Sequence, residues 1–202
     1  MMVKWISCRV LDRAAFDRGQ RAWGGLSGHA GFHGQCGGWS RDEPDLAHVF
    51  AWWSTERDHR EFMAGVHDGL AAGQVGTYGA IDVSRWEHHL DIGSGLPRAC
   101  PAGSVLRLAH CRVRDGRQDH FIRAQADVWN PGMRAWPGML GGLFAGRGRA
   151  EYLVLSLWES AAEHDSYRTG GLPDLRRRAQ AADDLARVEG DLILLDPAWT
   201  VS

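Results

Sequence analysis

Two histidines and one arginine are the residues of this chain best suited to acid–base chemistry. His33 and His48 lie on segments that read as neighbouring strands, and Arg9 lies on a third. A neutral imidazole can take a proton near neutral pH, and an arginine can stabilise the anion that remains. The set predicts proton removal from a mildly acidic phenol or enol, with His33 or His48 as the base and Arg9 beside the anion.

Three tryptophans could form the walls of a pocket around such a compound. Trp5, Trp39 and Trp52 present flat rings on which a planar aromatic ligand can stack. Ser7 and Gln35 share the predicted face with these rings and could bind polar groups of the ligand. The same histidines and tryptophans could instead be hydrogen-bonded core residues, and the sequence leaves that alternative open.

The first half of the chain alternates between strand-like and helix-like segments. Residues 3–10 read as a strand, and a helix of about 12 residues follows it. Ser54 or Thr55 can cap a second helix. The further strands are expected at 32–39, 46–53 and 76–86, and the second helix should carry on one face His59, Phe62, Met63, Val66 and Leu70.

The second half repeats the first at an offset of 103–105 residues, because Lys4 to Val10 recurs as Arg107 to Val113. Further pairs follow in order: Phe16 and Gln20 with Phe121 and Gln125, Gly34, Gly37 and Gly38 with Gly138, Gly141 and Gly142, and Trp53 and His59 with Trp158 and His164. Strands are expected at about 104–114, 136–146, 150–158 and 186–196, and helices at about 117–129 and 160–182.

The doubled βαββαβ order is that of the ferredoxin-like unit. One unit leaves a sheet face bare, and a partly apolar patch of about 500 Å² marks an interaction surface. Two tandem units can cover these faces mutually. The sequence predicts an α+β chain of two tandem ferredoxin-like units packed sheet to sheet as an intramolecular dimeric α+β barrel, with halves at 1–92 and 104–202 and a linker at 93–103.

The apolar parity of each strand is expected to pack under the helices, which leaves the opposite parity for the barrel interior. In the second half this parity is mostly aliphatic, but His110 and Arg112 join the candidate ligand-binding residues. A bulge at the glycines would reverse the assignment. In the first half the interior parity comprises Trp5, Ser7, Arg9, His33, Gln35, Trp39, His48, Phe50 and Trp52.

The first 90 residues resemble the YdbC-like family of uncharacterised bacterial proteins. The second copy resembles it less, since Leu143 stands where the first copy has Trp39 and the Val-His-Asp segment is missing. The residues that carry the resemblance are Lys4-Trp5-Ile6-x-Cys8, Gly31-Phe32-x-Gly34-Gln35-x-Gly37-Gly38-Trp39, Trp53 and Phe62-Met63-x-x-Val66-His67-Asp68.

That family is similar to the dimeric α+β barrel superfamily of antibiotic biosynthesis monooxygenases, haem-degrading enzymes, isomerases and non-catalytic stress proteins. The resemblance implies a small-molecule pocket protein of the monooxygenase-like type. An enzyme of this kind would carry out cofactor-independent oxidation or isomerisation of a planar aromatic compound. The alternative is a non-catalytic ligand-binding or stress-related barrel.

Haem is a further alternative that the resemblance implies, because haem-degrading members place a haem-ligating histidine towards the end of the second helix. His67 comes earlier than that position, and Ser7 replaces the asparagine of their first strand. We therefore expect no cofactor.

No metal site is expected either. His88 and His89 point to opposite faces of a strand, and the chain has no H-x-H, H-E-x-x-H or C-x-x-C spacing. A net charge of −2 gives no bulk attraction to nucleic acid or membrane. Four cysteines without paired spacing, no signal peptide and no long apolar run predict a reduced, cytoplasmic protein. A homodimer through an edge strand is a further option.

Overall fold

The computed structural model describes residues 1–96 and 100–202, so residues 97–99 of the predicted linker lie outside the described residues. The chain divides into two compact units. Unit 1 comprises residues 1–86, 100–102 and 193–202, and unit 2 comprises residues 87–96 and 103–192.

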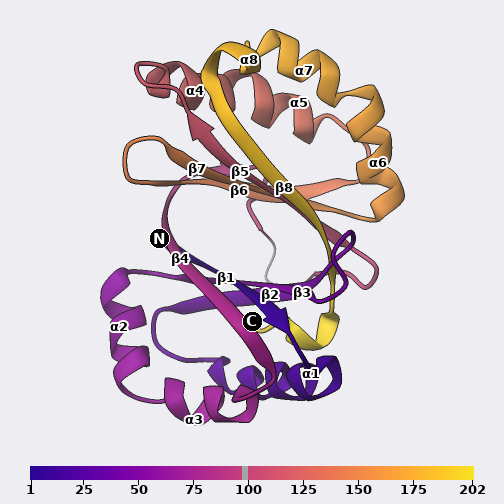
Figure 1. The fold of residues 1–202 in the computed structure, drawn as a ribbon. Coiled ribbons are helices and arrows are strands. Elements are labelled where there is room, and N and C mark those ends of the chain that lie inside the picture. The colour runs from indigo at the N-terminus through magenta and orange to yellow at the C-terminus, as the bar shows by residue number, and fades with distance from the viewer. Residues whose placement is uncertain (97–99) are drawn as a thin grey trace. The chain divides into compact units, whose positions relative to one another are not determined.

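Unit 1 is an antiparallel sheet with helices on one face (Figure 1). Its hydrogen-bonded strand order is β4-β1-β3-β2, and the end of β8 pairs with β2. The strands are β1 (Met2–Val10), β2 (Phe32–Ser40), β3 (Leu46–Trp53) and the first part of β4 (Tyr78–Ile92), and the helices are α1 (Arg13–Ala22), α2 (Glu56–Ala64) and α3 (His67–Ala71).

Unit 2 has the same plan, with strand order β8-β5-β7-β6 and the end of β4 paired with β6. A π-helical turn at Gln125–Trp129 joins its first two helices. The strands are β5 (Val105–Val113), β6 (Met139–Arg147), β7 (Glu151–Trp158) and β8 (Leu185–Leu195), and the helices are α4 (Gln118–Ala124), α5 (Asn130–Arg134), α6 (Ala161–Gly170), α7 (Leu172–Arg178) and α8 (Ala181–Asp184).

The predicted fold class is confirmed. Both units follow the ferredoxin-like order, and the eight strands of the chain follow one closed order, that of an antiparallel α+β barrel. The units differ from the predicted halves at two places. Glu87–Ile92 pair with β6 and belong to unit 2, and Ile193–Leu195 pair with β2 and belong to unit 1.

Side-chain caps fix where two helices of unit 1 begin. The carboxylate of Asp12 accepts a hydrogen bond of 2.9 Å from the backbone N–H of Ala15, and the hydroxyl of Thr55 accepts one of 3.1 Å from that of Asp58. The second predicted helix does not run through to Leu70, because it is interrupted after Ala64 by Gly65. His67 therefore begins α3 rather than lying near the end of a longer helix.

A shift of register in β2 changes which of its side chains face the predicted barrel interior. Phe32 pairs with Trp53, but Gly34 pairs with Trp52, so one extra residue lies between them. The extra residue turns Gln35 and Trp39 to the helix-covered face, where Trp39 packs 5.9 Å from Phe16. The interior assignment of Gln35 and Trp39 is therefore wrong, for the reason the glycines suggested.

The same shift recurs in β6 and corrects the glycine alignment of the two copies. Met139 pairs with Trp158 and Gly141 with Leu157. Gly141 has a φ of 154° and Gly34 one of 152°, so these two glycines correspond. The offset in this strand is thus 107 residues, and the residue equivalent to Trp39 is Gly146 rather than Leu143.

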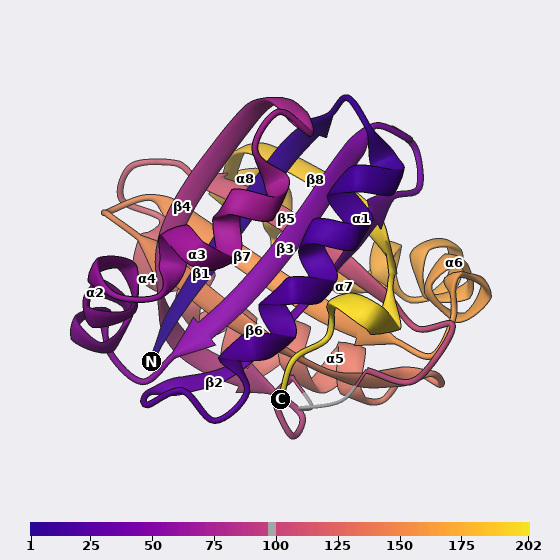
Figure 2. The same cartoon turned by 90° about the horizontal axis from the view of Figure 1, so that it is seen from below.

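The C-terminal residues complete the core of unit 1. Figure 2 shows the last segment of the chain running beside α1. Trp199 is fully buried, stacks edge-on against Phe16 at 5.6 Å and donates from its indole nitrogen to the carboxylate of Asp17 at 2.8 Å. Val201 belongs to the neighbouring cluster around Trp53 and Phe62. No helix of residues 1–96 and 100–202 is long and apolar enough to cross a membrane.

We predict that Gly34→Ala destabilises the protein by about 2 kcal/mol. An alanine there would have to adopt an unfavourable φ of 152°, and its Cβ would lie 2.9 Å from the indole nitrogen of Trp52. Urea unfolding measures the change. Gly24→Ala is the matched control, because a Cβ at Gly24 meets nothing within 4 Å. Equal stability of the two variants would contradict the role given to Gly34.

Candidate functional site

Unit 1 encloses a cavity of about 810 Å³ between the helix-covered face of its sheet and helices α1 to α3. Strands β1, β2, β3 and β4 form its floor. The lining residues are Lys4, Ile6, Cys8, Gln20, Trp23, Gln35, Val49, His59, Arg60, Met63, Ala64, His67, Ala71, Gln74, Tyr78, Ile81, Val83 and Arg85.

Lys4 is the most unusual group of this cavity. It lies on β1 in the same parity as Ile6 and Cys8, so its side chain enters the apolar side of the sheet, where it is only 7% exposed. Burial, reinforced by the nearby charge of Arg85, lowers the pKa of Lys4 from 10.5 to about 8. Within the described part of the chain, no carboxylate forms an ion pair with it.

His59 of α2 lies beside this cation. Its side chain is buried, and neither ring nitrogen has a hydrogen-bond partner in the described part of the chain. Burial first, and then the charges of Lys4 and Arg85, lower the pKa of His59 to about 4. The imidazole is therefore neutral at physiological pH and offers one donor and one acceptor to whatever occupies the cavity.

Two buried glutamines add further unpaired polar atoms. Gln74 accepts a hydrogen bond of 3.0 Å from the indole nitrogen of Trp23, which leaves its amide nitrogen without a partner among the described residues. The side-chain oxygen of Gln20 is likewise buried and unpaired there. Buried polar groups are nearly always satisfied in proteins, so such a cluster calls for a ligand or water.

The electrostatic character of the cavity is one-sided. Its charged lining residues are Lys4, Arg60 and Arg85, and none of its described lining residues is an aspartate or glutamate. Glu56 lies outside the lining and pairs with Arg85 at 3.4 Å and with Arg60 at 3.9 Å. Burial raises the pKa of the Cys8 thiol to about 12, so this thiol is neutral and not a nucleophile.

Apolar side chains form much of the remaining wall. Met63, Ile81 and Val83 are 38%, 50% and 50% exposed, so they lie where the cavity opens to solvent. Trp23 and Tyr78 provide aromatic surface. The arrangement suits an apolar molecule whose negative group reaches Lys4.

Trp5 and His48, two of the predicted site residues, meet on the opposite face of the same sheet. The indole nitrogen of Trp5 donates to Nδ1 of His48 at 3.1 Å, and Trp5 stacks on Phe50 with a ring distance of 6.2 Å. Ser7 is the cross-strand neighbour of His48. Trp52 lies on this face against Gly34.

The other residues of the predicted acid–base set lie apart from His48. Arg9 is exposed and pairs with Glu43 at 2.5 Å. His33 is exposed and its Nε2 lies 2.7 Å from the hydroxyl of Ser54. The structure thus does not bring His33, His48 and Arg9 together.

Gln35 and His67 line the cavity instead. The amide nitrogen of Gln35 donates to the backbone oxygen of Trp199 at 3.3 Å. Nδ1 of His67 lies 2.9 Å from the carboxylate of Asp68. Trp39 is on the same side of the sheet but outside the lining, under the guanidinium of Arg13, whose carbon lies 3.8 Å from the ring centroid.

The last two predicted residues belong to unit 2. His110 is half-buried with Nδ1 3.8 Å from the carboxylate of Glu189, and Arg112 is exposed opposite Glu151. No set of three or more potential metal-ligating side chains occurs within residues 1–96 and 100–202.

Lys4, Gln20, His59 and Gln74 were not among the site residues predicted from the sequence. Two signals were present. Lys4 interrupts the apolar parity of β1, and Gln20 and His59 recur in the second half as Gln125 and His164 on helix faces that are otherwise apolar. Burying a polar side chain costs free energy unless it is hydrogen-bonded, so polar residues repeated on otherwise apolar helix faces indicate a pocket in each half.

Haem, which the resemblance implies, would need a ligand for its iron and cations for its propionates. His67 has one ring nitrogen held by Asp68, the arrangement that orients metal-ligating histidines. Arg60 and Arg85 offer cations for two propionates. These residues fit haem in kind: His67 would hold the iron, Arg60 and Arg85 the propionates, and bound haem would supply oxygen chemistry at its iron.

The family model described as "Domain of unknown function (DUF4937)" matches residues 2–86. The protein YdbC of Bacillus subtilis (strain 168) is 34% identical over 74 residues, which are 35% of this chain and 62% of YdbC. The chain thus spans about three fifths of the curated relative it matches. These matches confirm the YdbC-like resemblance of the first half.

Solved structures are similar over nearly the whole chain. A candidate monooxygenase of Fusobacterium nucleatum has a TM-score of 0.80 at 7% identity, with 96% of this chain and 91% of that chain covered. An "anthrone oxidase-like protein" has a TM-score of 0.69 at 14% identity, with 96% and 91% covered. At these identities the similarity shows the fold.

We predict that the buried charge of Lys4 makes stability depend on pH. The folded state releases the Lys4 proton near pH 8 and the unfolded state near 10.5, so the unfolded state binds more protons in between and stability rises with pH there. Relative to Lys4→Met, the wild-type free energy of unfolding should rise by about 3 kcal/mol between these limits.

Urea unfolding at about pH 7 and about pH 10.5 measures the difference. Taking the difference from Lys4→Met removes the contributions of cysteines and tyrosines that titrate in the same range. Arg18→Met, which removes an exposed cation of α1 and keeps Lys4, should show the same pH dependence as the wild type. Parallel curves for wild type and Lys4→Met would contradict the buried position of this charge.

Proposed function

We propose that the chain is a small-molecule-binding protein of the antibiotic biosynthesis monooxygenase-like type, and that unit 1 binds a planar aromatic compound with an acidic group. The observation that carries this proposal is the ammonium group of Lys4, buried in a large cavity whose described lining has no carboxylate. A bound anion would supply the negative counter-charge that the ammonium group of Lys4 lacks.

The polar atoms around Lys4 support an oxygen-bearing ligand. A phenolate, enolate or carboxylate would accept hydrogen bonds from Lys4, from the free amide nitrogen of Gln74 and from one ring nitrogen of His59. Trp23, Met63 and Val83 would cover its apolar body. The proposed site therefore lies under the helices, not on the sheet face that carries Trp5 and His48.

The fold relatives support the same class of ligand. One similar structure is an anthrone oxidase-like protein, and anthrone is a planar aromatic compound that ionises as an enolate. A ligand of this kind fits within the cavity volume of about 810 Å³ and has a charge opposite to that of the lining residues.

Binding is tested by fluorescence titration with 8-anilinonaphthalene-1-sulfonate, an aromatic anion, and with the uncharged N-phenyl-1-naphthylamine. We predict that Lys4→Met lowers the affinity for the anionic probe by about tenfold or more, since one charge-assisted contact is lost. The affinity for the neutral probe should not change. Arg18→Met is the matched charge control, and thermal melting verifies that each variant is folded.

Two outcomes decide the proposal. Unchanged affinity of Lys4→Met for the sulfonate would overturn the role of Lys4. Hemin is a further probe of the same cavity, and a Soret band that His67→Ala abolishes and Lys4→Met retains would assign the cavity to haem.

Turnover is a second candidate activity, favoured by the lowered pKa of Lys4. A lysine with a pKa of about 8 has an appreciable fraction of free amine near neutral pH and can act as a general base. We infer that Lys4 would remove the acidic proton of the substrate and then, as ammonium, stabilise the anion. His59 would donate a hydrogen bond to the substrate oxygen.

Oxygen uptake with anthrone in metal-free buffer tests this activity, since oxidation of one anthrone by one O2 gives anthraquinone and water. We predict a kcat/KM that rises with pH and levels off above about pH 8, where Lys4 is the free amine. Lys4→Met should fall to the buffer rate. A pH-independent rate, or a rate unchanged in Lys4→Met, would leave binding as the function of the cavity.

A further inference from the structure

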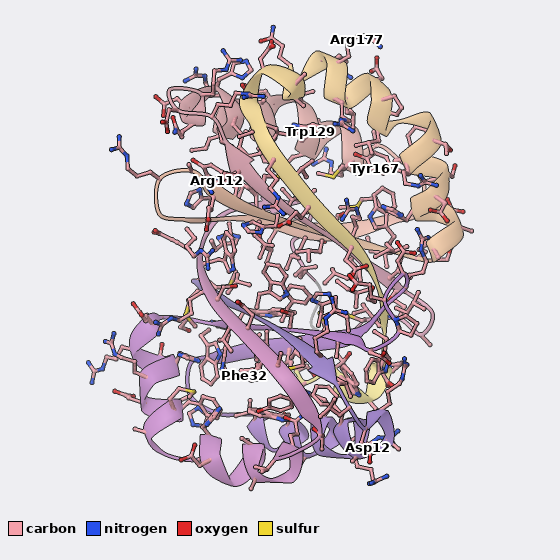
Figure 3. All side chains as sticks on the ribbon, in the orientation of Figure 1. Asp12, Phe32, Arg112, Trp129, Tyr167 and Arg177 are labelled. Carbon is pink, nitrogen blue, oxygen red and sulfur yellow. The ribbon has the colours of Figure 1, made fainter. Side chains whose placement is uncertain are left out.

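Unit 2 holds a second cavity, of about 180 Å³, between its own sheet and helices. Figure 3 shows Trp129 and Tyr167 on this helix-covered side of the sheet. The described residues that line it are Arg107, Ala109, Cys111, Phe121, Gln125, Trp129, Met133, Val154, Ser156, His164, Tyr167, Arg168, Leu172, Arg176, Ala181, Leu185 and Val188.

The two cavities are built on the same aromatic frame. In unit 1 the ring of Trp53 lies 5.5 Å from His59 at 76° and 5.0 Å from Phe62 at 28°. In unit 2 the ring of Trp158 lies 5.7 Å from His164 at 75° and 4.7 Å from Tyr167 at 27°. The frame is thus retained, although the two halves have diverged in sequence around it.

Two substitutions change the chemistry inside that frame. Arg107 takes the place of Lys4, and Tyr167 takes the place of Phe62. A guanidinium is planar, always charged and able to donate two parallel hydrogen bonds to one carboxylate. A tyrosine hydroxyl adds a further donor. Both changes favour an oxygen anion of defined geometry over a diffuse negative charge.

The guanidinium of Arg107 is held in place by the neighbouring strand. One of its nitrogens donates to the backbone oxygen of Asp191 at 3.1 Å. A Cβ at Gly190 would lie 2.1 Å from its nitrogens, so a larger residue at 190 would displace the guanidinium from this position. The charge of Arg107 also acts on the buried hydroxyl of Tyr167, where it opposes the rise in pKa that burial causes.

The helices of this unit add to the polar end of the cavity. Gln125, 2% exposed, begins the π-helical turn and donates to the side-chain oxygen of Asn130 at 2.7 Å. Trp129 ends the same turn and lines the cavity. π-Helical turns are rare and occur often at functional sites, and the equivalent helix of unit 1, α1, is a regular α-helix.

Charge and size together define the ligand. The charged lining residues are Arg107, Arg168 and Arg176, and none of the described lining residues is acidic. A closed apolar cavity of about 150 Å³ is enough to hold benzene. The cavity of about 180 Å³ therefore has room for one aromatic ring with a small charged substituent, and not for a polycyclic compound.

We propose that unit 2 carries a second, independent binding site that takes a small aromatic monocarboxylate, with Arg107 and Tyr167 on the carboxylate and the ring between Trp129, Met133 and Val154. This site does not depend on the ligand or activity of unit 1. The duplicated frame gives the chain two pockets with different preferences: a large one around a lysine and a small one around an arginine.

Isothermal titration with benzoate tests the proposal, with uncharged benzamide as the matched ligand. The titrations are made in the Lys4→Met background, which removes the proposed anion contact of unit 1, and Arg107→Met in that background should lose about tenfold or more in affinity for benzoate. Arg177→Met removes an exposed cation of α7 outside the lining and should leave the affinity for benzoate unchanged.

Milder variants guard against loss of folding. Tyr167→Phe recreates the residue of unit 1 and should weaken benzoate several-fold, and Arg107→Lys should bind more weakly than the wild type but more tightly than Arg107→Met. Equal affinity for benzamide and benzoate, or benzoate binding unaffected by Arg107→Met and Tyr167→Phe, would overturn the proposal. Because sulfonate binding reports on unit 1 separately, either proposal can fail without the other.

Discussion

The arrangement of both units depends on one extra residue in the second strand of each. At Gly34 and again at Gly141 the chain takes a backbone conformation that favours glycine, and the register against the next strand shifts by one. The shift sends Gln35 to the cavity and Trp39 to the core under α1. Without it, the polar side chain would leave the cavity wall.

The cavity of unit 1 has a cost that argues for its use. An unpaired lysine in an apolar environment destabilises the fold by about 3 kcal/mol, a large share of the 5–15 kcal/mol that holds a typical domain together. A methionine would fill the same space without that cost. Lys4 is also the only lysine of the sequence, since the other basic residues are arginines. A group with a tunable pKa at this one position is consistent with proton chemistry or charge-dependent binding.

The order of the elements was predictable because it rests on local periodicity. Patterns within a few residues predict Thr55 as a cap, the strand at 46–53 and the helix α1. The faces of β2 were not predictable with the same security, because one inserted residue reverses every side chain after it. Gln35 and Trp39 were misplaced for that reason.

The candidate site was harder to predict than the fold. Strand parity directed attention to Trp5 and His48, which satisfy each other by a hydrogen bond and behave as packed residues. Lys4 and His59 lie on faces that are otherwise apolar, so periodicity alone did not mark them as site residues. They mark a candidate site because their polar atoms are buried without hydrogen-bond or ion-pair partners among the described residues. Unpaired atoms cannot be identified from a sequence.

The packing of the C-terminal residues into unit 1 has a consequence for synthesis on the ribosome. Trp199 and Val201 belong to the hydrophobic clusters of unit 1, yet they are translated more than a hundred residues after Trp86. Because translation adds roughly 5–20 residues per second, the core of the nascent first unit stays uncovered for at least several seconds. The core of the half that is synthesised first is therefore completed last. Chaperones that shield exposed apolar surface can bind the nascent chain in that interval.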